Sequence, residues 1–288
     1  MSCGNLREGV SYLEAGARSI DRTNRIVPLL GVLYGSAFPG WLALPFQLLG
    51  RVDEAVKLAD DGLRHARESR HLFSLGLALI IRGSLAQLRR EPESARTYYE
   101  EAVTLSEENG FPTWLAAARF NHGEALAELG RLEQGIAEME AATEDCRRYG
   151  VAVRHYRTAL LAEACARIGR KEEALAMLND VLAQIEHTGE RREQAEILRF
   201  TGEVLLMRDG GATDEAERCF RGALEVAHAQ EAKWWELRAT TSLARLLAKQ
   251  GQGNEARAML AEIYNWFTEG FDTADLKVAK ILLDELSI

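Results

Sequence analysis

Histidines and cysteines are the residues of this chain whose side chains could bind a metal or attack a substrate, and it has six histidines and four cysteines. A zinc site needs them at short spacings, such as His-Glu-x-x-His or paired Cys-x-x-Cys motifs. Neither spacing occurs, and in the nearest cluster, His122-Gly123-Glu124, consecutive residues would point apart on a helix. There is also no Gly-x-Ser-x-Gly motif to expose a nucleophilic serine. We therefore expect no metal, no cofactor and no catalytic residue, and we interpret the chain as a non-enzyme.

One segment superficially resembles a dinucleotide-binding fingerprint: Gly251-Gln252-Gly253-Asn254-Glu255-Ala256. In nucleotide-binding folds the fingerprint follows a strand. Here it follows a helical pattern, so we interpret it as a tight turn between two helices. The sequence also has no Gly-x-x-x-x-Gly-Lys-[Ser/Thr] loop to hold phosphates. Acidic pairs such as Glu107-Glu108 are typical of solvated helix faces rather than of acid–base catalysis.

The composition limits the partners of this chain. Its formal net charge of −9 disfavours general binding to nucleic acid or to an anionic membrane, which both need a basic surface. No apolar stretch is long enough to span a bilayer or to act as a secretory leader. The cysteines are scattered, as expected of a cytoplasmic protein with free thiols. They are Cys3, Cys146, Cys165 and Cys219.

A small residue recurs about every 40 residues and gives the strongest structural signal in the sequence. These residues are Ala55, Ala95, Gly135, Ala174, Ala216 and Ala256. A glycine stands five residues before most of them, and apolar residues between the glycines recur at helical spacing. Signals for β-strands are missing. The period predicts stacked copies of one helix pair, and hence an all-α fold, a right-handed α-α superhelix.

The expected organisation is a single solenoid domain over residues 1–288. Residues 5–20 form an orphan or capping helix, and residues 22–70 an irregular first repeat in which 22–40 is a loop-rich connection. Five helix pairs follow over 71–266, and a capping helix over 273–286, with Asp272 as its N-cap and Asp275 in its first turn. The pairs are 71–89 with 92–109, 112–129 with 132–149, 152–168 with 171–187, 192–208 with 213–229, and 232–250 with 253–266.

The sequence also predicts how the helices at the two ends of the chain are covered. The first helix looks like the second member of a pair whose first member is missing, which predicts either an upstream segment or a covering partner; the alternative is a modified capping helix. If a second copy of the chain is the covering partner, the apolar residues Leu6, Val10 and Leu13 form the interface of a homo-oligomer. Near the other end we expect Trp234 and Phe267 to pack the last helix onto the final repeat.

The repeat is similar to the tetratricopeptide repeat. The pair ending at Ala256 has Leu243-Ala244 and Gly251 at the small and turn positions, although its period of about 40 exceeds the standard 34 or so. A narrower resemblance rests on Lys233-Trp234-Trp235-Glu236-Leu237 within residues 230–246, and on Tyr264-Asn265-Trp266-Phe267 within 264–277. These segments resemble the C-terminal repeat region of bacterial multidomain signalling ATPases, many of which carry a class III nucleotide cyclase domain. The resemblance implies a regulatory or partner-sensing arm.

Polar residues on the first helix of each pair are the candidate binding site. In repeats of this kind the first helices line a concave groove, which predicts an extended protein or peptide partner. An acidic stretch with Glu124, Glu128 and Glu163 would lie beside a basic one. The basic stretch consists of Arg199, Arg238 and Arg245, and the two together would suit an extended peptide with charges at both ends. The alternative is a small-molecule sensor, which would need a closed pocket with convergent polar groups. The groove residues are Asn121, Glu124, Glu128, Tyr156, Glu163, Arg167, Arg199, Glu203, Arg238 and Arg245.

Overall fold

The computed structural model describes residues 5–19, 26–27, 31–149, 155–208 and 212–287. Contacts divide the chain into two compact units. The N-terminal unit comprises residues 8–47 and 51–154, and the C-terminal unit comprises 155–288 with the short segments 1–7 and 48–50. Gly150, which the glycine pattern predicts to end a helix, lies outside the described residues.

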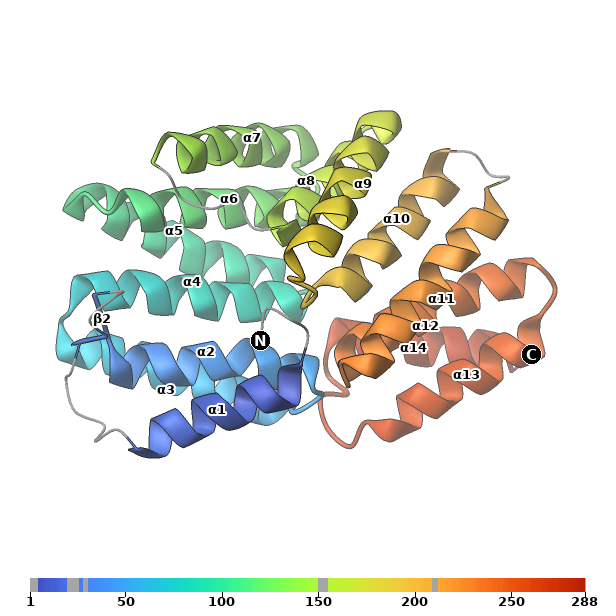
Figure 1. Cartoon of the computed structure of the whole chain (residues 1–288), viewed down its shortest axis with the longest axis horizontal. Helices are drawn as coiled ribbons and strands as arrows, with labels where there is room; N and C mark the ends of the chain where they lie inside the picture. Colours follow the sequence, from blue (N-terminus) through green and yellow to red (C-terminus); the bar gives the residue numbers. More distant parts are fainter. Residues whose placement is uncertain (1–4, 20–25, 28–30, 150–154, 209–211, 288) are drawn as a thin grey trace. The chain divides into compact units, whose positions relative to one another are not determined.

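The N-terminal unit is built from helices that follow one another in antiparallel pairs (Figure 1). The helices that lie wholly or mostly in this unit are α1 (Leu6–Ser19), α2 (Tyr34–Leu48), α3 (Val52–Ser69), α4 (Leu72–Leu88), α5 (Pro92–Asn109), α6 (Pro112–Glu128) and α7 (Leu132–Arg148). Pro92 and Pro112 each stand in the first turn of their helix, where the missing N–H costs nothing.

Two features of this unit differ from the expectation. A short antiparallel pair joins β1 (Ile26–Val27) to β2 (Val32–Leu33), and strands of two residues are too short to show an alternating pattern. The helix α2 begins inside the predicted loop and contains Pro39 and Pro45. Proline disfavours a helix interior. Here packing outweighs propensity, because the apolar residues that follow Pro39, such as Ala43 and Phe46, are buried.

The C-terminal unit continues the same pattern with three helix pairs and a last single helix. Its helices are α8 (His155–Arg167), α9 (Lys171–Thr188), α10 (Gln194–Arg208), α11 (Thr213–Ala229), α12 (Lys233–Lys249), α13 (Gly253–Trp266) and α14 (Ala274–Glu285). The first helices of successive pairs pack side by side, α8 on α10 and α10 on α12, and α14 packs on α12 in the same way. The second helices α9, α11 and α13 lie against the other side of this layer.

The recurring small residue marks the closest crossing of the two helices in a pair. Ala95, Ala174 and Ala216 have no exposed surface. At Gly135 the crossing is tighter still, since a Cβ there would lie 2.3 Å from the carbonyl oxygen of Gly123 on the facing helix. Glycine is therefore required where the other repeats use alanine.

Within the described part of residues 71–286 the helices overlap the predicted ranges, and α5, α11 and α13 have the predicted bounds. Trp234 is fully buried and meets Phe267 edge to face at 5.8 Å, which confirms the predicted packing. The cap of the last helix was predicted wrongly, because its N-cap is Thr273 and not Asp272.

The three residues expected to form a homo-oligomer interface lie on α1, and the homo-oligomer stays a prediction. Within the single chain, Leu6 is fully buried and Val10 is 5% exposed. Leu13 is half-buried.

Candidate functional site

The candidate site is the side of α8, α10 and α12 that faces away from the second helices. On α10 the residues Leu198 and Leu205 line an open groove of about 600 Å³ between α9 and α11. Helical geometry places Glu196, Glu203 and Met207 roughly opposite them. We call this opposite side the inner face.

The inner face consists of three rows of residues at equivalent repeat positions. Within each row the residues are about 40 positions apart, one on each of α8, α10 and α12. The first row is Tyr156, Glu196 and Arg238; the second is Glu163, Glu203 and Arg245; the third is Arg167, Met207 and Lys249.

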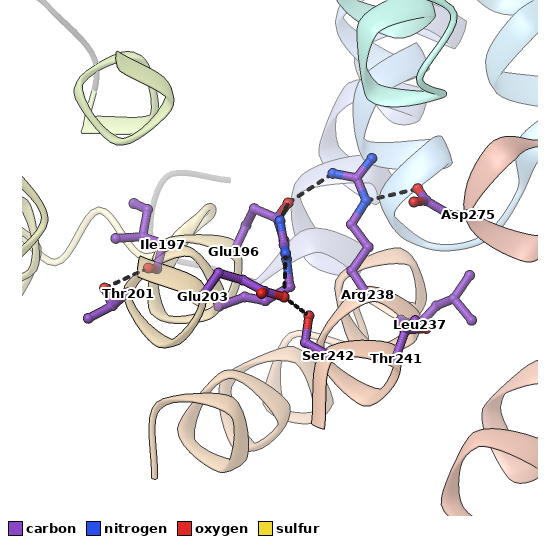
Figure 2. Close-up of polar contacts among 10 residues, drawn as sticks. Glu196, Ile197, Thr201, Glu203, Leu237, Arg238, Thr241, Ser242 and Asp275 are labelled. Carbon is purple, nitrogen blue, oxygen red and sulfur yellow. Dashed lines mark hydrogen bonds and ion pairs between the residues drawn. The ribbon is translucent and has the colours of Figure 1, made fainter. Parts of the chain in front are cut away.

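Glu196 and Arg238 of the first row belong to a buried polar network (Figure 2). Arg238 Nη1 donates to Glu196 Oε1 at 2.9 Å, and Arg238 Nε donates to Asp275 Oδ2 of α14 at 2.8 Å. Arg199 Nε and Nη2 donate to the two carboxylate oxygens of Glu196 at 2.7 and 2.9 Å. The four residues are 1–7% exposed. One arginine thus ties three helices together.

The network extends to the second row through Glu203. Ser242 Oγ of α12 donates to Glu203 Oε1 at 2.6 Å, as Figure 2 shows, and Arg199 Nη1 lies 3.5 Å from the same oxygen. These contacts fix the register of α10 against α12. Because Glu203 is level with Ser242, Met207 lies beside the last turns of α12.

Neighbouring acids keep both buried arginines charged. Burial alone would lower the pKa of Arg199, but the charge of Glu196 and its hydrogen bonds outweigh this, and the pKa is raised. For Arg238 the same penalty of burial is outweighed by Asp275 and Glu196, and the pKa is again raised. Buried charges of this kind are stable only when paired.

An aromatic cluster packs beside the network. The ring of Tyr156 stacks on Phe200 at 6.5 Å and tilts against Trp235 at 6.2 Å. The guanidinium of Arg238 lies 5.2 Å from the centre of the Trp235 ring, and that of Arg199 lies 4.8 Å from the centre of Phe200. Cation–π contacts of this kind further stabilise the positions of both arginine side chains.

The structure corrects the expectation of a continuous basic stretch. Arg199 and Arg238 were expected to offer free charge to a partner, but both are buried and neutralised by acids of this chain. Arg245 is exposed. On α8 Glu163 pairs with Arg167 at 3.7 Å.

Three predicted residues belong to the other unit. Asn121, Glu124 and Glu128 lie on α6 of the N-terminal unit. Asn121 is buried and donates to Ser84 Oγ at 3.4 Å, while Glu124 is half-buried and Glu128 exposed. The structure therefore groups only the other seven predicted residues in one unit.

Sequence reasoning missed Glu196 and Asp275. The signal for Glu196 was present, because it stands 40 residues after Tyr156 and 42 before Arg238, in the same row. Asp275 carried no such signal, because α14 begins after an irregular turn. In the sequence, its position in the first turn of a helix is explained by the helix dipole alone.

The described residues show neither a metal-binding cluster nor a membrane-spanning helix. They contain no cluster of three or more His, Cys, Asp or Glu side chains arranged to hold a metal ion. Among the helices so described, none is both long and apolar enough to cross a membrane.

The comparisons with known proteins give the fold. No protein-family model and no curated protein matches the chain. A structure of NprR in complex with its cognate peptide NprX is 17% identical, covers 97% of this chain and 79% of its own, and has a TM-score of 0.66. The apo form of RapI is 12% identical over 98% and 91% of the two chains, with a TM-score of 0.58.

A tetratricopeptide repeat protein from Parabacteroides merdae is 16% identical over 99% of this chain and 93% of its own, with a TM-score of 0.54. At such identities a likeness shows the fold alone. The chain is an all-α protein of tetratricopeptide-like helical repeats.

Proposed function

We propose that this chain is a non-catalytic interaction module whose inner face, on α8, α10 and α12, binds an extended segment of a partner protein or a peptide. The observation that carries the proposal is the alignment of the three rows. Side chains that repeat from helix to helix can contact successive residues of one extended chain. The peptide-bound NprR structure supports the choice of a peptide ligand.

The buried network supports the same proposal by making the face rigid. A binding surface loses less affinity when its side chains are already ordered before the partner arrives. The network fixes α10, α12 and α14 relative to one another through Arg238. The exposed residues of the second and third rows are then presented from a preorganised layer.

The alternative of a small-molecule sensor finds less support. Such a sensor needs convergent polar groups that are free to meet a ligand. Here Glu196, Arg199, Arg238 and Asp275 converge on one another and are satisfied by their own contacts. The regulatory role in a larger cytoplasmic signalling protein remains part of the proposal.

A peptide selection tests this function. Binders would be selected from a random decapeptide library on the full chain, and their dissociation constants measured by fluorescence anisotropy. The inner-face variant Glu163→Ala/Arg167→Ala/Met207→Ala should weaken binding at least tenfold. The control variant Glu225→Ala/Arg257→Ala changes exposed residues of the second helices α11 and α13 and should bind as the parent does. Equal binding by the inner-face variant would contradict the proposal.

A further inference from the structure

We infer that the segment bound by the inner face is acidic, and that Arg245 and Lys249 contact its carboxylates. This inference rests on the proposed function and adds the chemistry of the partner.

The charged residues on α8 and α10 are compensated within the chain. Glu163 and Arg167 pair on α8 at 3.7 Å. On α10 the carboxylate of Glu203 is held by Ser242 at 2.6 Å and lies 3.5 Å from Arg199. A partner therefore meets little unbalanced charge on these two helices.

The residues of α12 differ. Arg245 and Lys249 are both exposed, and neither side chain has a hydrogen-bond or ion-pair partner in the part of the chain that the structure describes. They stand four residues apart on one helix face, where like charges repel and destabilise the helix. The helix dipole explains a lysine in the last turn. It does not explain an arginine one turn earlier, so the pair is better explained by an anionic partner.

An apolar residue accompanies this positive pair. Met207 is 38% exposed and lies on α10, level with the last turns of α12. Unbranched and polarizable, methionine adapts to different apolar side chains. The pattern of the face thus fits a segment that combines Asp or Glu with an apolar residue. A polyanion such as nucleic acid fits less well, because the whole chain carries a net charge of −9.

The library selection described above provides the test. Among peptides that lose affinity for the inner-face variant, Asp and Glu should be enriched over the starting library. The affinity of these peptides should fall as NaCl rises from about 50 to 300 mM. The double variant Arg245→Gln/Lys249→Gln should weaken them at least tenfold. The matched control Arg221→Gln/Arg257→Gln alters two exposed arginines on α11 and α13 and should leave the affinity unchanged.

The inference can fail while the proposed function stands. Peptides that depend on the inner face but show no acidic enrichment, or that bind the Arg245→Gln/Lys249→Gln variant as tightly as the parent, would overturn it. A library that yields no inner-face peptide would overturn both statements. Tighter binding of a single-stranded dT20 oligonucleotide than of any selected peptide, lost in the double variant, would replace the peptide by nucleic acid.

Discussion

The guanidinium of Arg238 contacts the carboxylate of Glu196 at 2.9 Å, although the two residues are 42 positions apart in the sequence. The same guanidinium contacts Asp275 at 2.8 Å, 37 positions further along. Both contacts are buried, with side chains 1–7% exposed. Arg238 therefore connects one repeat to the next and the last repeat to the closing helix α14.

The first prediction concerns this arginine. Substitution Arg238→Met keeps an unbranched apolar stem but removes the cation that contacts the buried carboxylate of Asp275. It also removes one of the two arginines that contact Glu196, which keeps its contact with Arg199. Loss of one partner of a buried ion pair costs about 3–5 kcal/mol. We expect the free energy of unfolding, measured by urea denaturation at pH 7, to fall by about 3 kcal/mol. Arg257→Met on the exposed face of α13 is the control, with an expected change within about 0.5 kcal/mol. Equal losses would mean that the network does not stabilise the fold.

The second prediction concerns the attachment of α14. Asp275→Asn removes the charge that faces Arg238 while keeping the shape of the side chain. We expect backbone amides of residues 276–285 to exchange with deuterium at least tenfold faster, because the helix opens locally more often. Asp284→Asn, at an exposed pair with Lys280, serves as the comparison. Unchanged protection in the Asp275 variant would show that apolar packing alone holds α14.

The third prediction concerns the tight crossing of α6 and α7. In Gly135→Ala the new methyl group would stand 2.3 Å from the carbonyl oxygen of Gly123, so the helices must move apart. Overpacking of this kind costs about 1–3 kcal/mol. Gly253→Ala introduces the same methyl group at a helical position with open space and should not destabilise the protein. Urea titrations of both variants give the comparison; a neutral Gly135→Ala would contradict the close approach.

The fourth prediction concerns Cys219 in the groove between α9 and α11. Burial raises the pKa of this thiol, and the nearby charge of Arg218 offsets the rise only in part. At pH 8 its alkylation by iodoacetamide, followed by mass spectrometry of the Cys219 peptide, should be slower than that of glutathione. The rate should still increase above pH 9. The pKa of Cys219 is higher in the folded than in the unfolded protein. The thiol therefore stabilises the folded state at pH values below its ordinary pKa, and this stabilisation is lost as the pH rises through the folded-state pKa. Faster alkylation than glutathione would contradict the raised pKa.

The helix pairs could be predicted from the sequence because the residues that indicate them act locally. Glycine turns, prolines at helix starts and the small residue at each crossing act over a few residues, as at Gly130 and Pro112. The helix α2 could not be predicted in the same way. Its two prolines oppose a helix locally, and only burial against the rest of the chain stabilises it.

The site was harder to predict because it depends on contacts between repeats. Alignment on the small residue placed Tyr156, Glu203 and Arg238 on the inner face. It could not show that Arg199 pairs with Glu196 and that Arg238 pairs with Asp275. Ion pairs between helices depend on how far one helix is shifted along its neighbour, and the sequence does not give this shift. A search of each row for opposite charges would have found Glu196 opposite Arg238.

The most direct measurement of the central claim is the deuterium-exchange footprint of a selected peptide on the full chain. With the peptide at saturation, we expect new protection in α8, α10 and α12 and none in α9, α11 and α13. Residues around Arg245 and Lys249 should show the largest change. Protection confined to α9 and α11, or absent from α12, would contradict binding at the inner face.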